Sequence, residues 1–141
     1  MSTVKQILNK KGNEVFATTP DKQAIDALKI MDQKGIGVLV IVENDKIKGL
    51  FTEGDYISRV LLKDISQDTP VDDVMTKNIK TIQADKTVNE TMQLMIDKDI
   101  RYLPITDNGK LAGIISMGDC VNEVISEQEE IIEHLEHYIH S

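Results

Sequence analysis

The sequence contains one cysteine, no tryptophan, two phenylalanines and three tyrosines among its 141 residues. A single cysteine excludes an intrachain disulfide and a cysteine-rich zinc site, and it favours a reducing compartment, so we expect a cytoplasmic protein. Because aromatic residues are so few, the interior must be aliphatic, and it is built from Ile, Val, Leu and six methionines.

Long apolar runs and basic patches are also lacking. The longest apolar run, residues 36–42, is far shorter than the roughly 20 residues that a membrane-spanning helix needs, and no signal-peptide pattern is present, so no membrane association is expected. The formal net charge of −8 repels nucleic acid, so no nucleic-acid partner is expected. Nucleophile elbow, HExxH, P-loop and Cys/His patterns are missing too, and the sequence therefore predicts a protein that is not an enzyme.

The chain carries one pattern twice. Residues 49–55 read GLFTEGD, and residues 113–119, 64 positions later, read GIISMGD. The same offset relates further identical pairs: Asp21/Asp85, Lys22/Lys86, Met31/Met95, Lys34/Lys98, Ile36/Ile100, Leu39/Leu103, Ile41/Ile105, Asn44/Asn108, Lys46/Lys110 and Val60/Val124. This period exceeds the roughly 20 to 50 residues of solenoid repeats. We therefore expect two small α+β units, with function located where they meet.

Periodicity and turn residues give the same element order in both copies. The first copy is expected to have a short strand at 15–17, a helix from the Thr19 cap to Gly35, strands at 36–42 and 47–51, and a helix from Thr52. The second copy is expected to have a short helix at 71–75, a strand at 81–82, a helix from about Asp85 with Val88, Met92, Met95 and Ile96 facing inward, strands at 102–106 and 111–115, and a helix from Ser116. A brief helix within residues 1–14 is expected to pack on the other copy. The predicted domains are residues 1–68, 69–126 and 127–141.

Residues 127–141 have no counterpart in the first copy. Ser126 and Glu129 have capping-box spacing, which predicts a separate helix here. Its apolar face consists of Ile131, Ile132, Leu135, Tyr138 and Ile139. An isolated helix of this length is marginal in water, so it needs a partner surface on its own module or on another subunit. We expect a homodimer.

The repeated pattern places a hydroxyl and a carboxylate at a helix start, Thr52 with Asp55 and Ser116 with Asp119. A helix N-terminus favours an anion, and a carboxylate one turn later accepts hydrogen bonds from hydroxyl groups. Together they suit a phosphate next to a vicinal diol, as in a ribonucleotide. The alternative is a plain capping box that only stabilises the helix.

These residues, together with the strand at 100–105 (IRYLPI), resemble a tandem pair of cystathionine-β-synthase (CBS) domains over nearly all of the chain except the tail. The resemblance implies an α+β fold in which two β-α-β-β-α motifs are related by a pseudo-twofold axis, with the sheets packed together and the helices outside. It also implies two clefts for adenosine ligands such as AMP, ADP, ATP, S-adenosylmethionine or NAD. The implied function is a regulatory module that signals occupancy to an unknown downstream protein; the alternative is a scaffold protein with vestigial clefts.

The resemblance assigns specific residues to the two clefts. The implied nucleotide-binding residues are Thr52, Asp55, Arg101 and Tyr102 for one cleft and Gly37, Val38, Ser116 and Asp119 for the other. Arg101 aligns with Gly37, so the Asp55 cleft has a guanidinium for phosphate whereas the Asp119 cleft has no cation at that place. We therefore expect the Asp55 cleft to bind phosphate more tightly. The alternative for Arg101 is a solvated charge at a strand end.

Two other candidates have structural explanations. Cys120 is expected to be a packed core thiol, and the alternative is redox sensing. His134, His137 and His140 are expected to lie on a solvated helix face, and the alternative is weak metal binding. No cofactor and no structural metal are predicted.

Overall fold

The computed structural model describes residues 2–140, which form two compact units. Unit 1 combines the residues up to Glu14 with those from Lys80 onward, and unit 2 is Val15–Ile79. Each unit has one three-stranded sheet accompanied by helices. The predicted α+β fold class, with two copies of one plan, is confirmed. The pseudo-twofold arrangement of the copies remains a prediction.

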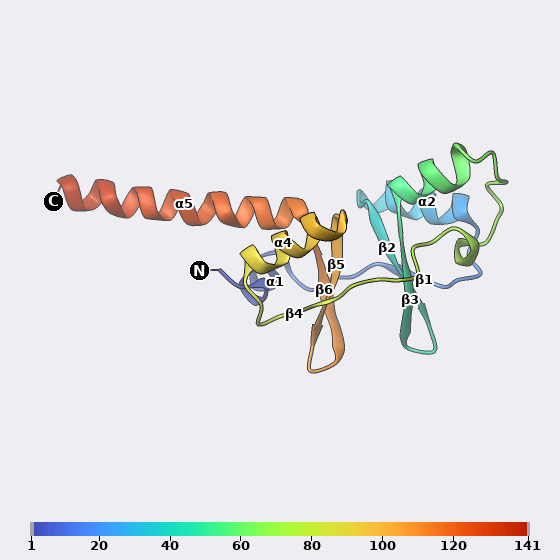
Figure 1. The fold of residues 1–141 in the computed structure, drawn as a ribbon, viewed down its shortest axis with the longest axis horizontal. Coiled ribbons are helices and arrows are strands. Elements are labelled where there is room, and N and C mark those ends of the chain that lie inside the picture. The colour runs from blue at the N-terminus through green and yellow to red at the C-terminus, as the bar shows by residue number, and fades with distance from the viewer. Residues whose placement is uncertain (1, 141) are drawn as a thin grey trace. The chain divides into compact units, whose positions relative to one another are not determined.

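The two units share the order strand, helix, strand, strand, helix, to which each adds further segments (Figure 1). Unit 2 contains β1 (Ala17–Thr18), α2 (Ala24–Lys34), β2 (Val38–Glu43), β3 (Lys46–Thr52), α3 (Glu53–Tyr56), the π-helical turn η1 (Ile57–Leu61) and the 3₁₀ turn η2 (Val71–Asp73). Unit 1 contains α1 (Val4–Lys11), β4 (Ile82–Gln83), α4 (Val88–Lys98), β5 (Tyr102–Asp107), β6 (Lys110–Ser116) and α5 (Met117–His140).

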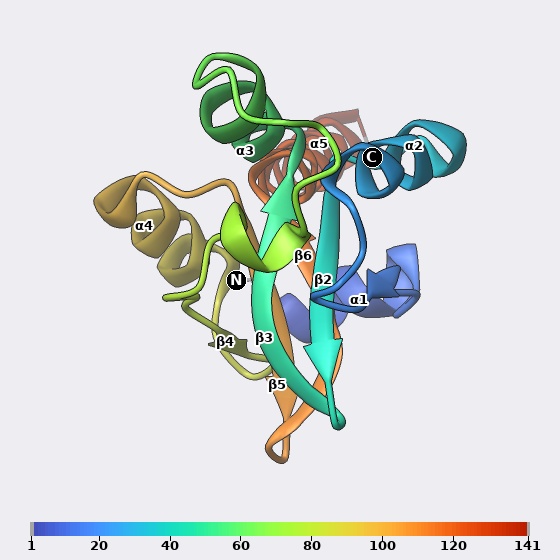
Figure 2. The ribbon, with the colours of Figure 1, turned by 90° about the vertical axis from the view of Figure 1, so that its right-hand side faces the viewer.

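A hairpin forms the centre of each sheet. In unit 2, β1 pairs with β2 in parallel and β2 pairs with β3 antiparallel, and β4, β5 and β6 repeat this arrangement in unit 1. The hairpin turns use residues with positive φ, Asn44 (52°) with Asp45 (62°) and Asn108 (52°) with Gly109 (78°), as two-residue turns that match strand twist require. In unit 2, α2 and α3 lie at the end of the hairpin opposite this turn (Figure 2). The repeated Asp motif is therefore at the open end of the hairpin.

The cores are aliphatic, as the composition predicts. Buried side chains of unit 2 include Met31, Leu39, Ile41, Phe51, Val60, Val71, Val74 and Met75. Those of unit 1 include Val4, Ile7, Leu8, Val88, Met95, Leu103, Ile105, Ile115 and Cys120. The inward face of α2 consists of the buried Ala24, Ala27 and Met31, with Leu28 partly buried.

Helix α1 packs on the second copy, as predicted. The amides of Val4 and Lys5 donate to the carbonyl oxygens of Lys86 and Ala84, both at 2.9 Å. The side chain of Leu8 lies so close to Gly113 that a Cβ added there would be 2.6 Å from Leu8 Cδ2. The compact units therefore group the chain differently from the predicted ranges 1–68 and 69–126, because α1 joins unit 1 and the residues up to Ile79 join unit 2.

The start of the first long helix differs from the prediction. Helix α2 begins at Ala24 with Gln23 as its N-cap, and Thr19 does not cap it. The carbonyl oxygens of Pro20 and Lys22 accept hydrogen bonds from the amides of Asp72 and Val71, at 3.0 and 2.8 Å. Residues 20–23 therefore bind the distant η2 segment in place of forming a first helical turn.

Two predictions in the second copy are also corrected. Ile96 is 62% exposed, because Met95 occupies the inward position of that turn of α4. Ser126 does not cap a new helix, because α5 runs without a break from Met117 to His140. The last part of α5 extends far beyond the other elements of unit 1 (Figure 1). No helix within residues 2–140 combines the length and apolar character needed to cross a bilayer.

Candidate functional site

The strand-to-helix turn of unit 2 is a complete capping box. Thr52 ends β3 and is the N-cap of α3, where its Oγ1 accepts a hydrogen bond from the Asp55 amide at 3.0 Å. The Asp55 carboxylate accepts in return from the Thr52 amide at 3.1 Å. These two bonds fix the carboxylate at the helix start.

Unit 1 repeats this geometry between β6 and α5. The Asp119 amide donates to Ser116 Oγ at 3.0 Å, and the Ser116 amide donates to Asp119 Oδ2 at 2.9 Å. The capping-box interpretation is therefore correct as local structure for both copies. It does not exclude ligand binding, because each cap hydroxyl keeps its own proton to donate.

The residues just before β2 and β5 occupy the first backbone amide of helices α3 and α5. The Glu53 amide donates to the Gly37 carbonyl oxygen at 3.1 Å, and the Met117 amide donates to that of Arg101 at 2.9 Å. Within residues 2–140, this leaves one first-turn amide without a hydrogen bond in each motif, at Gly54 and at the equivalent Gly118. The predicted anion site at the helix N-terminus thus has one free amide in each unit.

Lys11 of α1 lies against Asp119. Its Nζ is 2.7 Å from Asp119 Oδ2 and also donates to the Ile114 carbonyl oxygen at 3.0 Å. Burial raises the pKa of Asp119, but the Lys11 ammonium and the bonds from Ser116 outweigh it and hold the pKa below its ordinary value. Asp119 is therefore ionised at neutral pH. The sequence argument considered only the place that matches Arg101, where Gly37 offers no cation; Lys11 supplies a cation to Asp119 from a different element, α1.

Asp55 has a different set of neighbours. The Thr76 hydroxyl lies 3.2 and 3.3 Å from its two carboxylate oxygens, and Arg59 Nε is 3.8 Å from Oδ1. Arg59 also donates through NH1 to the Met75 carbonyl oxygen at 2.8 Å. Both oxygens of Asp55 thus have partners, whereas within residues 2–140 no hydrogen bond reaches Asp119 Oδ1.

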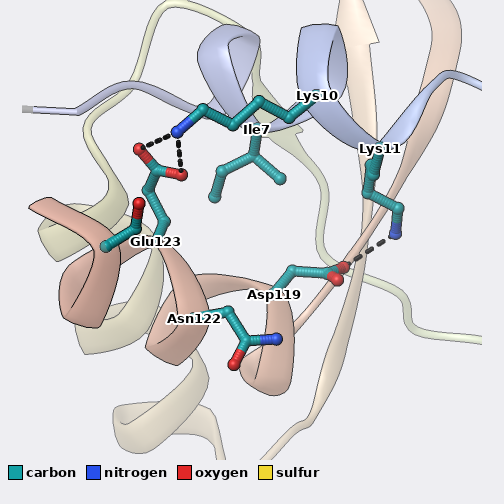
Figure 3. A pocket seen from close by; sticks show the side chains of 7 residues that line it. Ile7, Lys10, Lys11, Asp119, Asn122 and Glu123 are labelled. Atoms are coloured by element: carbon teal, nitrogen blue, oxygen red, sulfur yellow. Dashed lines mark hydrogen bonds and ion pairs between the residues drawn. The ribbon is translucent and has the colours of Figure 1, made fainter.

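A cavity of about 300 Å³ opens beside Asp119, between α1 and α5 (Figure 3). Lys10 closes one side by donating to both Glu123 carboxylate oxygens, at 3.1 and 3.0 Å. Ile7 and Asn122 complete much of its lining. The cavity therefore combines two cations and two carboxylates with one apolar wall.

The predicted site residues fall into two groups, one in each unit. Val38 faces Thr52 across the β2–β3 ladder, and Tyr102 faces Ser116 across the β5–β6 ladder. Unit 2 thus holds Gly37, Val38, Thr52 and Asp55, and unit 1 holds Arg101, Tyr102, Ser116 and Asp119. The resemblance implies that the cleft of each Asp is lined by the strand start of the other motif, and this remains a prediction.

Sequence reasoning missed three residues that touch the carboxylates, Lys11, Arg59 and Thr76. Arg59 had a local signal, because it lies four residues after Asp55 on the same helical segment. Lys11 and Thr76 are distant in sequence from their partners. The repeat offset nevertheless places Thr76 at the position equivalent to Gly12, directly after Lys11. The sequence alone could therefore have indicated that both segments lie near a motif carboxylate.

Cys120 is completely buried in the unit 1 core, which confirms the packed-thiol prediction. Burial, aided by the charge of Asp119, raises the pKa of the thiol to about 11. For metals, the part of the chain that the structure describes contains no group of three or more His, Cys, Asp or Glu side chains placed to hold an ion.

The model of the CBS domain family matches residues 4–62 and 71–126. The chain belongs to the CBS domain family. A solved CBS-domain protein from Burkholderia ambifaria is 40% identical, with a TM-score of 0.87 over 90% of this chain and 96% of that one. The mitochondrial CBS domain-containing protein CBSX3 of Arabidopsis thaliana is 32% identical, over 98% of this chain and 72% of that protein.

Two more distant CBS structures were solved with adenosine compounds. CBSX2 in complex with AMP has a TM-score of 0.72 at 23% identity, over 91% of this chain and 99% of that one. The CBS pair of MJ0100 in complex with 5′-methylthioadenosine and S-adenosylmethionine has a TM-score of 0.78 at 23% identity, over 91% of this chain and 98% of that one. At this identity the likeness demonstrates a shared CBS fold.

Proposed function

We propose that this CBS protein is a non-catalytic regulatory module that binds an adenine nucleotide of the AMP, ADP or ATP type and transmits its occupancy to a partner protein. The observation that carries the proposal is the matched pair of capped carboxylates, Asp55 and Asp119, each beside a hydroxyl, a cation and one free amide. A plain helix cap needs neither the cation nor its repetition in both units.

The unit 1 motif has the complementary groups for a phosphorylated ribose. Asp119 is ionised, and its Oδ1 is available to accept from a ribose hydroxyl. The Gly118 amide and the Ser116 hydroxyl are donors for a phosphate oxygen at the positive end of α5. Lys11, whose Nζ lies 2.7 Å from Asp119 Oδ2, supplies a positive charge that favours a phosphorylated nucleotide over an uncharged nucleoside.

The unit 2 motif has the same types of group, but its carboxylate and its cation already have hydrogen-bond partners within the unit. A ribose hydroxyl must replace the Thr76 hydroxyl on Asp55, and the bonds concerned are long, at 3.2 and 3.3 Å. Arg59 is the nearby cation, and its NH1 is already bonded to Met75. We propose that this motif binds the same ligand class, with Arg59 as the phosphate contact in addition to the predicted Arg101.

The adenosine compounds bound by CBSX2 and by MJ0100 support the choice of ligand class. Regulation requires that the ligand bind two states of the module with different affinity. In unit 1, a phosphate that draws Lys11 away from Asp119 Oδ2 would shift the end of α1, which is anchored by its buried Val4, Ile7 and Leu8. We propose that such a change is what a downstream partner detects. The cytoplasmic location and the homodimer complete the proposal.

Thermal unfolding in the presence of millimolar AMP, ADP, ATP, NAD or S-adenosylmethionine tests the proposal. A ligand present at about 100 times its Kd adds roughly 2.7 kcal/mol to the free energy of unfolding, and one of the adenine nucleotides should produce such a shift. The double variant Asp55→Asn with Asp119→Asn keeps both caps, since an amide oxygen also accepts from the cap amide, but it should lose the shift.

Calorimetry separates the two motifs. The single variants Asp55→Asn and Asp119→Asn should each remove one of two binding events. If no compound in the panel stabilises the wild-type protein, the nucleotide proposal is wrong and the scaffold alternative is favoured. Equal shifts in the wild type and the double variant would show that the carboxylates are not the site.

A further inference from the structure

The last part of α5, residues 127–140, which we call the tail, lies outside both family-model matches. The apolar α5 side chains that pack in the unit 1 core, Met117, Cys120 and Val124, all precede the tail, and Glu127 at the start of the tail accepts a hydrogen bond from Ser2 Oγ at 3.1 Å. In the tail, Ile131, Ile132 and Leu135 are each more than half exposed, and Ile139 is 73% exposed. A helical extension of this length is marginal without a covering surface.

The apolar residues of α5 follow a seven-residue repeat. With Val121 as position a, the three a positions are Val121, Gln128 and Leu135, the three d positions are Val124, Ile131 and Tyr138, and the three e positions are Ile125, Ile132 and Ile139. None of these nine positions is charged. A repeat of this kind is the pattern of a helix that packs along another helix. Because Val124 already packs on the unit 1 core, the part of the seam that is open to a second helix runs from Gln128 to Ile139.

The charges of the tail argue against a basic partner helix. Its acidic residues Glu129, Glu130, Glu133 and Glu136 fall at the outer positions b, c and f, and there is no Lys or Arg in α5. A basic partner helix would need acidic residues beside the apolar seam, at e and g. Here e is isoleucine throughout, and g carries only Glu127 and His134.

A second copy of the same helix meets no charge repulsion. In a parallel pair, g faces e, so Glu127 faces an isoleucine. In an antiparallel pair, g faces g, and alignment of the apolar layers brings Glu127 opposite His134 of the second copy. In neither orientation do two glutamates face each other across the seam, and the remaining acidic residues stay in water.

We propose that the tail is a self-association helix that pairs along its a, d and e positions with the tail of a second copy of this chain. The pairing is independent of the nucleotide proposal, because the tail contains none of the ligand residues. It covers the apolar face that unit 1 leaves exposed, and it makes the helical state of the tail depend on protein concentration.

Mass measured by light scattering across a concentration series tests this proposal. Leu135→Glu places a charge in the seam, and His137→Glu adds the same residue two positions later on the outer face. The wild type and His137→Glu should form dimers or larger assemblies, whereas Leu135→Glu should dissociate at least about tenfold more readily. Wild-type helicity, measured by circular dichroism, should fall on dilution, and unfolding of the two units should be unaffected.

Two results would overturn the proposal. One is a wild-type protein that stays monomeric at high concentration, whether or not its tail is helical. The other is an unchanged assembly in Leu135→Glu and in a chain that ends at Ser126, which would place the contact elsewhere, on the exposed helix faces of the units or on another molecule.

Discussion

At the scale of single residues, the two motif carboxylates obtain a cation by different routes. Arg59 follows Asp55 by one helical turn, but the equivalent residue after Asp119 is Glu123, an acid. The cations of unit 1 come instead from α1, where Lys11 pairs with Asp119 and Lys10 with Glu123. The repeat therefore conserves a paired carboxylate at the helix start while the source of its partner has changed.

The pairing of Asp119 makes stability depend on pH. Because folding holds the Asp119 pKa below its value in the unfolded chain, near 3.9, its ionised form stabilises the fold above that pH. This contribution is lost as pH falls through the folded-state pKa. We expect urea unfolding to show a greater loss of stability as pH falls below about 5 in the wild type than in Asp119→Asn, by at most about 1 kcal/mol because the pair is partly exposed.

Lys11→Met is the control for the cause of this shift. It keeps the aliphatic stem and removes the ammonium, so the Asp119 pKa, followed by carboxyl NMR, should rise towards its ordinary value. A pKa that stays low in this variant would assign the shift to the Ser116 bonds alone. Equal pH profiles for the wild type and Asp119→Asn would mean that Asp119 titrates alike in the folded and unfolded chains.

The sequence predicted the capped carboxylates but not their partners, for a physical reason. Thr52 with Asp55 and Ser116 with Asp119 are local contacts within one helical turn, so spacing alone reveals them. Lys11 reaches Asp119 only after α1 has packed on unit 1, and no local propensity encodes that docking. Arg59 was predictable in principle, because its spacing from Asp55 is local.

At the scale of elements, the equivalent helices α2 and α4 end in the same backbone conformation but with different residues. Gly35 ends α2 and Asp99 ends α4, both in the left-handed conformation, with φ of 65° and 53°. A non-glycine residue there costs up to about 1–2 kcal/mol. Asp99→Gly should therefore stabilise unit 1 by up to about 1 kcal/mol, measured by chemical unfolding, since Asp99 is exposed and, within residues 2–140, its side chain makes no hydrogen bond or ion pair.

Asp97→Gly is the comparison variant, because Asp97 lies in the same helix with ordinary helical geometry; it also removes the hydrogen bond that Gln93 Nε2 donates to Asp97 Oδ1 at 2.8 Å. There the substitution should destabilise by roughly 0.5–1 kcal/mol. Opposite signs for the two variants are the expected result. If both destabilise, Asp99 in the native state carries no strain that glycine relieves.

Element prediction succeeded where local signals agree and failed where distant segments compete. Both hairpins were predicted from β-branched runs around Asn-containing turns, and both are present. The start of α2 was predicted too early. Thr19 and Pro20 are typical of a helix start, but the carbonyl oxygens of the residues that follow Thr19 bond to η2, some fifty residues later, and do not begin the helix. The break at Ser126 was wrong because α5 already has helical residues before it, and a cap is useful only where a helix begins.

At the scale of the whole molecule, each unit is completed by a segment that precedes the first strand of the other copy. Helix α1 precedes β1 of unit 2 but packs in unit 1, where Leu8 touches Gly113. The residues after Pro70 precede β4 of unit 1 but pack in unit 2, where a Cβ at Gly49 would be 2.5 Å from the Thr76 carbonyl oxygen. Each of the two duplicated units therefore includes a segment that, in sequence, directly precedes the first strand of the other unit.

This exchange predicts which fragment folds. Residues 15–79 contain all of unit 2, including the buried Val71, Val74 and Met75. Residues 4–68, a fragment of equal length cut at the boundary that the sequence suggested, lack these three side chains and carry α1 without the core that α1 covers. A domain of this size is only marginally stable, so the loss of three buried apolar side chains, at about 1.5–3 kcal/mol each, is decisive.

We expect residues 15–79 to give a cooperative unfolding transition in urea, followed by circular dichroism, and residues 4–68 to give none. Adding back residues 69–79 to the second fragment should restore the transition, because it returns η2 and the Leu50–Thr76 bridge to the β3 edge. Equal behaviour of the two fragments would show that the η2 segment contributes little to unit 2.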